Sequence, residues 1–278
     1  MPLKLMYITN RTDVAQIAES AGVDRIFVDM EYIGKSDRQG GMDTVQSHHT
    51  LDDVKNIASA ITTAELLVRV NPIHDATTMY ESSKEEIDGA IENGAQILML
   101  PYFKMVDEVK KFIDFVDGRA KIIPLVETPE AVAVIDDILA LDRIDEIFIG
   151  LNDLSLGYGK KFMFELLTDG TVEELCYKFR KKGIPYGFGG IASLGHGVLP
   201  SENVIIEHYR LGSTCAILSR SFCNVNQISH MGVISSTFVN GVNEIRKLEK
   251  SIAFHSDFFR NNTDFVKDIV EKVVHSEV

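Results

Sequence analysis

The feature of this sequence that most constrains its fold is a regular alternation between two kinds of segment. Short runs of β-branched and apolar residues alternate with longer segments in which apolar residues recur at helical spacing. Such an alternation is typical of βα units around a parallel sheet. The predicted strands are Leu3–Ile8, Arg25–Met30, Glu65–Val70, Gln96–Pro101, Lys121–Val126, Glu146–Gly150, Pro185–Gly189 and Cys215–Leu218.

Residues that begin and end helices stand where this arrangement requires them. Thr50 and Ser83 each precede an acidic first turn and are predicted N-caps. Glycines follow several helical segments, where a left-handed C-cap needs no side chain. The predicted helices are Asp13–Ala21, Leu51–Ile61, Lys84–Asn93, Val106–Val116, Pro129–Leu141, Val172–Lys182 and Glu202–Tyr209, and the glycines are Gly22, Gly94, Gly118, Gly183 and Gly212.

Eight strands joined by helices in a chain of 278 residues predict an α/β fold, a TIM (β/α)8 barrel with additional C-terminal helices. An open doubly wound sheet is the alternative, but no GxGxxG motif follows the first strand. After residue 225 only helical patterns remain, at Met231–Leu248 and Asn262–Val274. We therefore expect a catalytic barrel over 1–225 and a helical extension over 226–278, packed on the barrel or on a neighbouring subunit of a homo-oligomer.

The charge balance excludes several classes of partner. The chain has 28 Lys and Arg against 41 Asp and Glu, a formal net charge of −13, and no basic cluster. Nucleic acid and anionic membranes are therefore not expected partners. The apolar runs are shorter than the roughly 20 residues of a membrane helix, and the chain starts with a strand pattern rather than a signal peptide, so we expect a cytoplasmic protein. Its three cysteines have no CxxC spacing, which disfavours a disulfide framework.

Polar residues collect at the ends of the predicted strands, where a TIM barrel builds its active site. Glu127 and Asp153 end adjacent strands, so their carboxylates could share a divalent cation, with magnesium or manganese the best match. Alternatively, both acids cap the helices that follow. Arg69 suits bidentate binding of a carboxylate or an enolate oxygen, or an ion pair with Asp29 or Glu31, and the two roles can coexist.

At these residues the sequence resembles the HpcH/HpaI aldolase and citrate lyase family of metal-dependent barrels. The motifs that carry the resemblance are Phe27-Val28-Asp29-Met30-Glu31, Leu67-Val68-Arg69-Val70-Asn71, Gly94-Ala95-Gln96-Ile97-Leu98-Met99-Leu100-Pro101, Val126-Glu127-Thr128-Pro129-Glu130-Ala131 and Ile149-Gly150-Leu151-Asn152-Asp153-Leu154-Ser155. The resemblance implies that Glu127 and Asp153 are the metal ligands and that Arg69 binds the keto or enolate oxygen of the substrate.

The resemblance implies further roles around these three residues. Backbone N–H groups of the segment Gly150, Leu151 and Asn152 would bind the substrate carboxylate. Asp29 and Glu31 would hydrogen-bond to water on the metal. Independently of the resemblance, the glycines around Gly189 permit close approach of an anionic ligand, or form a tight turn. Ser219-Arg220-Ser221 could add a second anion contact.

The expected function is that of a divalent-metal-dependent carbon–carbon lyase, which forms or cleaves an aldol bond through a pyruvate-type enolate. Its substrates would be a keto acid and an aldehyde. No lysine ends a predicted barrel strand, which argues against a Schiff-base aldolase. The alternatives are a citrate-lyase-like enzyme acting on an acyl-CoA, and a barrel that has lost catalysis and acts as a binding subunit.

Two departures from the family pattern bear on the mechanism. Tyr32 stands where pyruvate aldolases of the family carry a His that acts as acid and base, and Leu125 where many carry a Gln. The loop from Ile33 to Thr50 contains His48 and His49, and we consider it as a lid that supplies the missing base. Its basic, glycine-containing part could instead bind a phosphate or a sugar acid, or the loop could be merely solvated.

Overall fold

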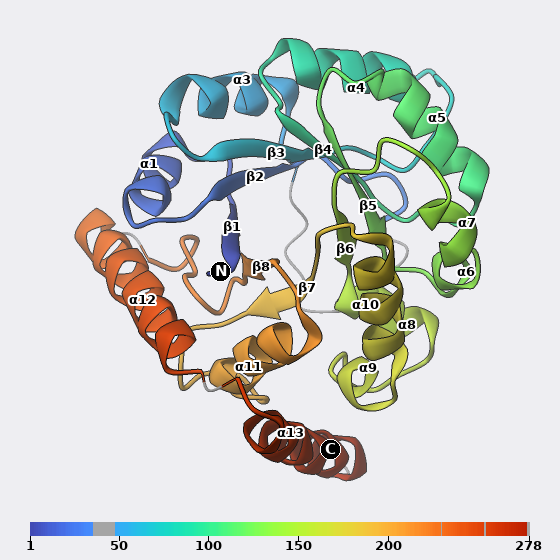
Figure 1. The fold of residues 1–278 in the computed structure, drawn as a ribbon. Coiled ribbons are helices and arrows are strands. Elements are labelled where there is room, and N and C mark those ends of the chain that lie inside the picture. Colours follow the sequence, from blue (N-terminus) through green and yellow to red (C-terminus); the bar gives the residue numbers. More distant parts are fainter. Residues whose placement is uncertain (36–47, 229, 253, 277–278) are drawn as a thin grey trace.

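The computed structural model describes residues 1–35, 48–228, 230–252 and 254–276. Its eight parallel strands close into a barrel in chain order, and β8 pairs with β1. The helices surround these strands (Figure 1), so the predicted TIM barrel is confirmed. The strands are β1 (Lys4–Ile8), β2 (Arg25–Asp29), β3 (Glu65–Arg69), β4 (Ile97–Leu100), β5 (Lys121–Val126), β6 (Ile147–Ile149), β7 (Tyr186–Ile191) and β8 (Cys215–Leu218).

The strands are apolar at consecutive positions because both of their faces are covered. Alternate residues fill the inside of the barrel and the layer between the strands and the helices. In β2, for example, Phe27 packs inside the barrel, whereas Ile26 and Val28 pack under the helices. The inner cluster consists of Met6, Phe27, Leu67, Ile97, Met99, Ile123, Leu125, Phe148 and Cys215.

Most helices occur close to their predicted bounds. They are α1 (Thr12–Ser20), α3 (Leu51–Ala60), α4 (Ser83–Glu92), α5 (Val106–Val116), α6 (Pro129–Ala133), α7 (Ile135–Leu139), α8 (Leu151–Gly157), α9 (Glu165–Thr168), α10 (Thr171–Lys182), α11 (Ser201–Leu211), α12 (Met231–Ser251) and α13 (Ser256–His275). The single helix predicted over Pro129–Leu141 was wrong, because Val134 leaves helical geometry and separates α6 from α7. The short helices α8 and α9 were not predicted.

The predicted helix caps are confirmed with one exception. Thr50 caps α3 by accepting a hydrogen bond from the Asp53 N–H, and all five predicted C-cap glycines have positive φ. The prediction of Ser83 as a cap was wrong by one residue. Ser82 accepts the N–H of Glu85 and caps α4, while Ser83 is the first residue of the helix.

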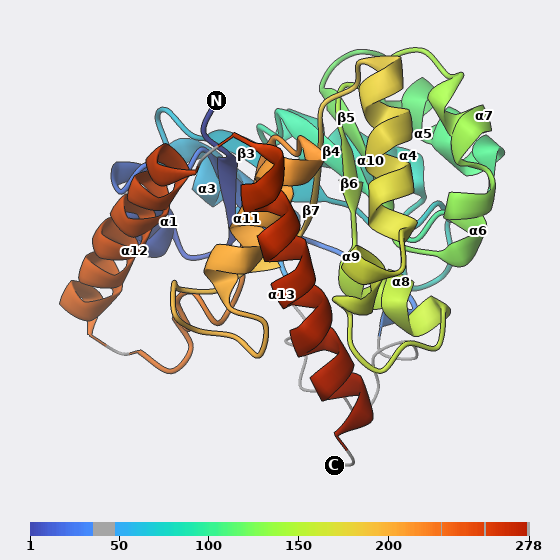
Figure 2. The same ribbon diagram turned by 60° about the horizontal axis from the view of Figure 1, so that its bottom comes forward.

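The C-terminal helices pack on the chain's own barrel. Helix α12 lies against α1 and α11, and α13 lies against α11 and α9, with its C-terminal end reaching beyond the barrel (Figure 2). Glu249 of α12 accepts the Leu3 N–H at 2.8 Å, and Arg246 donates to the Leu3 carbonyl at 2.8 Å, so α12 is tied to the start of β1. No helix among the described residues is long and apolar enough to cross a membrane. The domain boundary at residue 225 and the homo-oligomer stay predictions.

A buried ion pair stabilises the end of the barrel opposite the candidate site. Arg25, at the start of β2, donates two hydrogen bonds to Glu146, at 2.8 and 2.9 Å, and one to Glu65 at 3.2 Å. Cys215 lies 2.9 Å from Glu146 through its sulfur. Arg25 and Glu146 are both buried, so water solvates neither charge and each depends on the other for compensation.

Replacing Arg25 by Met should destabilise the barrel by about 3–5 kcal/mol, because the Glu146 carboxylate would stay buried without a partner. The measurement is the urea unfolding transition. Lys121→Met is the matched control, since Lys121 pairs with Glu65 at the surface and should contribute less than about 1 kcal/mol. Equal losses in the two variants would contradict this account.

Candidate active site

The strand register brings Asp29 and Arg69 together. They are paired residues at the carboxyl ends of β2 and β3. The Arg69 guanidinium donates from Nε and Nη2 to the two Asp29 carboxylate oxygens, both at 2.8 Å, and lies 5.6 Å from the centre of the Phe27 ring. The predicted ion pair between Arg69 and Asp29 is therefore present, and Nη1 of Arg69 does not take part in it.

Glu31 and Lys35 complete a buried cluster of four charges. Lys35 Nζ lies 2.9 Å from Asp29 and 3.4 Å from Glu31, and Arg69 Nε lies 3.3 Å from Glu31. Burial raises the pKa of Asp29, but Arg69 and Lys35 outweigh it and hold that pKa well below its usual range. Two acids and two bases balance one another, so the cluster carries no net charge.

Lys35 is a site residue that the sequence analysis placed only in a loop. Its side chain is buried in the barrel mouth although it follows β2 by six residues. The available signal was its spacing of four residues from Glu31, which suits an ion pair on one helical turn. That signal is weak without knowledge of the local turn.

Glu127 follows β5 and is buried. Its Oε1 accepts the N–H of Tyr102, which has a left-handed φ of +48°, at 2.9 Å. A Cβ at Gly150 would lie 2.8 Å from Glu127 Oε2, so only glycine leaves room for this carboxylate. Burial, with repulsion from Glu31 and Asp153, raises the pKa of Glu127 to about 8 despite the attraction of Arg69.

Asp153 lies beside Glu127, in the first turn of α8. Both acids line two neighbouring hollows of about 210 and 190 Å³. The alternative that Glu127 caps the next helix was wrong, because Thr128 Oγ1 accepts the Ala131 N–H and caps α6. Within the described ranges, no three His, Cys, Asp or Glu side chains form a complete metal site. A cation on Glu127 and Asp153 would therefore take its other ligands from water and substrate.

The backbone donors expected for the substrate carboxylate are only partly available. The Gly150 N–H donates to the Val126 carbonyl at 3.0 Å, so its expected use as a substrate donor was wrong. Leu151 and Asn152 stand in the first turn of α8, where a helix provides no acceptor for its own N–H groups. Gly189 has φ +51° and packs against Leu151, whose Cδ1 would lie 2.8 Å from an added Cβ.

The two histidines of the predicted lid differ in position. His48 is exposed, whereas His49 is partly buried and its Nδ1 accepts the Asp29 N–H at 3.0 Å. Burial lowers the pKa of His49. The ring is thus neutral with its proton on Nε2, and it offers a donor rather than a free basic nitrogen. The glycine-containing part of this loop, residues 38–41, lies outside the described residues.

A wider hollow of about 430 Å³ opens beside the first two, at the ends of β1 and β8. It shares Arg69, Asn152 and Ser219 with the hollow that Glu127 lines. Arg11 and Arg220 line it too, at the place where a second anion contact was predicted. That contact stays a prediction.

The sequence and the fold are similar to those of one protein family. The HpcH/HpaI aldolase/citrate lyase family matches residues 4–164, more than half of the chain. Among solved structures, the HpcH/HpaI aldolase from Desulfitobacterium hafniense DCB-2 is similar at 16% identity and TM-score 0.57, over 92% of this chain and 95% of that one.

An HpcH/HpaI aldolase/citrate lyase family protein from Burkholderia cenocepacia J2315 is similar at 16% identity and TM-score 0.59, over 88% of this chain and 95% of that one. At this identity the two structures support the fold alone. No curated protein matches the sequence. The family match covers all five motifs at the ends of the strands, and the chain belongs to the HpcH/HpaI aldolase/citrate lyase family.

Proposed function

We propose that this chain is a divalent-metal-dependent carbon–carbon lyase that forms or cleaves an aldol bond through a pyruvate-type enolate. Membership of an aldolase and lyase family supports the reaction class. The observation that carries the proposal is the buried Glu127 carboxylate beside Asp153, with a raised pKa and a hollow in front of it. The attraction of Arg69 does not offset the burial of this carboxylate, and a divalent cation would add the positive charge that balances it.

The donor set fits magnesium or manganese. Two carboxylates with open positions suit ions that keep several waters and bind through few protein ligands. When bound, the cation would stabilise the negative charge that develops on the keto oxygen of the substrate as a methyl proton leaves.

The remaining polar groups of the mouth would orient the substrate. Arg69, held by Asp29, would donate an N–H to the keto oxygen, and the first-turn N–H groups of Leu151 and Asn152 would bind the carboxylate. His49 would donate from Nε2 to the oxygen of the aldehyde. Lys35 and Glu31 would keep the guanidinium of Arg69 in place.

Tyr32 does not fill the role of the family His. Burial and the neighbouring Glu86 raise its pKa above the usual 10, so the phenol stays protonated at neutral pH. The methyl proton would therefore leave to a group other than Tyr32. The candidates named from the sequence for this base are His48 and His49, whereas Asp29 and Glu31 are expected to hydrogen-bond to water on the metal. Asp29 is a weak base because of its depressed pKa.

With pyruvate and Mg²⁺ or Mn²⁺ in heavy water, the protein should incorporate deuterium into the pyruvate methyl group, as followed by proton NMR. Removing the metal with a chelator should stop the exchange and reduce keto-acid binding nearly to nothing, since the mouth would lose its main positive charge. Glu127→Gln should do the same by lowering metal affinity at least about tenfold.

The control for this variant is Glu130→Gln, which removes the same charge from an exposed position three residues away. It should leave metal content and exchange unchanged. Exchange that continues in the chelator, or equal metal content in wild type and Glu127→Gln, would refute the ligand assignment.

The raised pKa of Glu127 also predicts how the metal-free protein responds to pH. An unfolded Glu ionises near 4.5, whereas folded Glu127 ionises near 8, so between these values the unfolded state binds fewer protons and gains in relative stability. Wild type should therefore lose stability against Glu127→Gln as pH rises from about 5 to about 8, by on the order of 3 kcal/mol. Urea unfolding at a series of pH values in a chelator measures this, and a constant difference would contradict it.

A further inference from the structure

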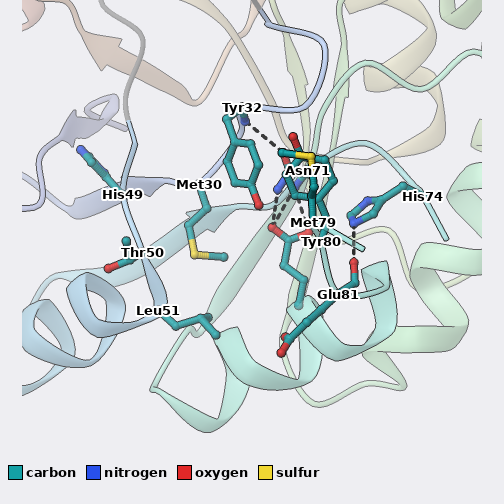
Figure 3. A pocket seen from close by; sticks show the side chains of 11 residues that line it. Met30, Tyr32, His49, Thr50, Leu51, Asn71, His74, Met79, Tyr80 and Glu81 are labelled. Atoms are coloured by element: carbon teal, nitrogen blue, oxygen red, sulfur yellow. Dashed lines mark hydrogen bonds between the residues drawn. The ribbon is translucent and has the colours of Figure 1, made fainter. Parts of the chain in front are cut away.

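A separate hollow of about 290 Å³ lies on the flank of the barrel mouth, between the exits of β2 and β3 and the first turns of α3 and α4. Tyr32 and Met30 enter it from the β2 side, and Tyr80 and Met79 from the segment before α4 (Figure 3). It shares no lining residue with the hollows that Glu127 lines, and only His49 with the wider one. The keto-acid site proposed above does not use it.

The charge of this hollow is negative. Its acids are Glu81 and Glu86, its histidines are His49 and His74, and no Lys or Arg lines it, so its formal charge is negative with His counted as neutral. Across the described part of the chain, no basic side chain lies within ion-pair distance of Glu86. Burial raises the pKa of Glu86 by more than the hydrogen bonds from Asn71 and the neighbouring His74 lower it. A cationic ligand would supply a compensating charge.

The hydrogen bonds that Glu86 already accepts limit which cationic groups could bind to it. Its Oε1 accepts from Asn71 Nδ2 at 2.7 Å, and both of its oxygens lie 3.2 Å from the Asn71 backbone N–H. The carboxylate therefore has little capacity left for the three donors of a primary ammonium group. A quaternary ammonium group, with every N–H replaced by a methyl or another carbon, needs no hydrogen bond and uses only the charge.

The rest of the lining suits the same ligand. The rings of Tyr32 and Tyr80 lie 5.4 Å apart, tilted by 52°, and present aromatic surface to the hollow. The thioethers of Met30 and Met79 add polarisable apolar surface. Aromatic rings attract quaternary ammonium groups through their negative faces.

We propose that this hollow, defined by Met30, Tyr32, Asn71, Met79, Tyr80 and Glu86, is a binding site for a small organic cation with a quaternary, methylated ammonium group. The rings of Tyr32 and Tyr80 contact its methyl groups, and Glu86 balances its charge. A volume of about 290 Å³ holds such a group with part of its substituent.

The site is connected to the barrel mouth through Asn71. Its Oδ1 accepts the N–H groups of Tyr32 and Ile33, both at 2.9 Å, while its Nδ2 donates to Glu86. The same backbone segment leads to Lys35, which pairs with Asp29 and Glu31. A ligand on Glu86 would thus be linked through Asn71 to the backbone segment that leads to Lys35 and the charge cluster of the mouth.

The test is a ligand-observed NMR titration of the full chain with tetramethylammonium, and with tert-butanol as a neutral probe of similar shape. Tetramethylammonium should bind saturably, and tert-butanol at least about tenfold more weakly. Glu86→Gln should weaken tetramethylammonium binding about tenfold, and Tyr80→Leu several-fold. Methylammonium should bind more weakly than tetramethylammonium.

Glu92→Gln is the matched control, because it removes the same charge from the far end of the same helix. It should bind tetramethylammonium like wild type, and circular dichroism should show all variants folded. Equal binding of tert-butanol, equal loss in Glu92→Gln and Glu86→Gln, tighter binding of methylammonium or no saturable binding would each overturn the proposal. These measurements need neither metal nor pyruvate, so they do not depend on the proposed lyase activity.

Discussion

The balance of buried charge at the carboxyl ends of the strands is the constraint on which this site depends. Closing eight strands brings Asp29, Glu31, Glu127 and Asp153 into one mouth, where water screens their repulsion poorly. Arg69 and Lys35 neutralise the first two. The pKa of Glu127 is raised by burial and by the nearby acids Glu31 and Asp153, and the attraction of Arg69 does not offset this. The charges of Asp29 and Glu31 are thus balanced by Arg69 and Lys35, whereas the charge beside Glu127 is not. A cation would be stabilised beside Glu127.

The sequence predicts most of this arrangement because its information is local. Strand and helix periods locate the elements, and a barrel places the residues after each strand in one mouth, so the sequence predicts that Glu127, Asp153 and Arg69 lie there together. Lys35 was not recognised as a site residue, because its place depends on the turn after β2. The expected Gly150 donor was wrong because its N–H belongs to the contact with Val126. The break at Val134 has no equivalent signal in the sequence.

Tyr32 shows how a departure from a family pattern can alter two sites at once. A tyrosine with a raised pKa has no basic nitrogen to offer the methyl proton, so the position loses its acid–base role. The same ring lies 5.4 Å from Tyr80 and lines the flanking hollow. His49 lines both this hollow and the wider one, but its Nδ1 is occupied by the Asp29 N–H. Tyr32 would therefore supply no base to the mouth, and its ring forms an aromatic wall of the flanking hollow.

The net charge of −13 is distributed unevenly over the mouth of the barrel. A keto acid is repelled by the protein as a whole, so its site must reverse the field over a short range. A divalent cation on Glu127 and Asp153, next to Arg69, would do so, because screening limits the other charges to about 8–10 Å. The flanking hollow keeps the negative sign of the whole chain, because Glu86 and Glu81 line it and its only basic side chains are His49 and His74, with no Lys or Arg. Ligands of opposite charge would therefore be sorted between neighbouring hollows on one face of the barrel, with Asn71 as the hydrogen-bonded link between them.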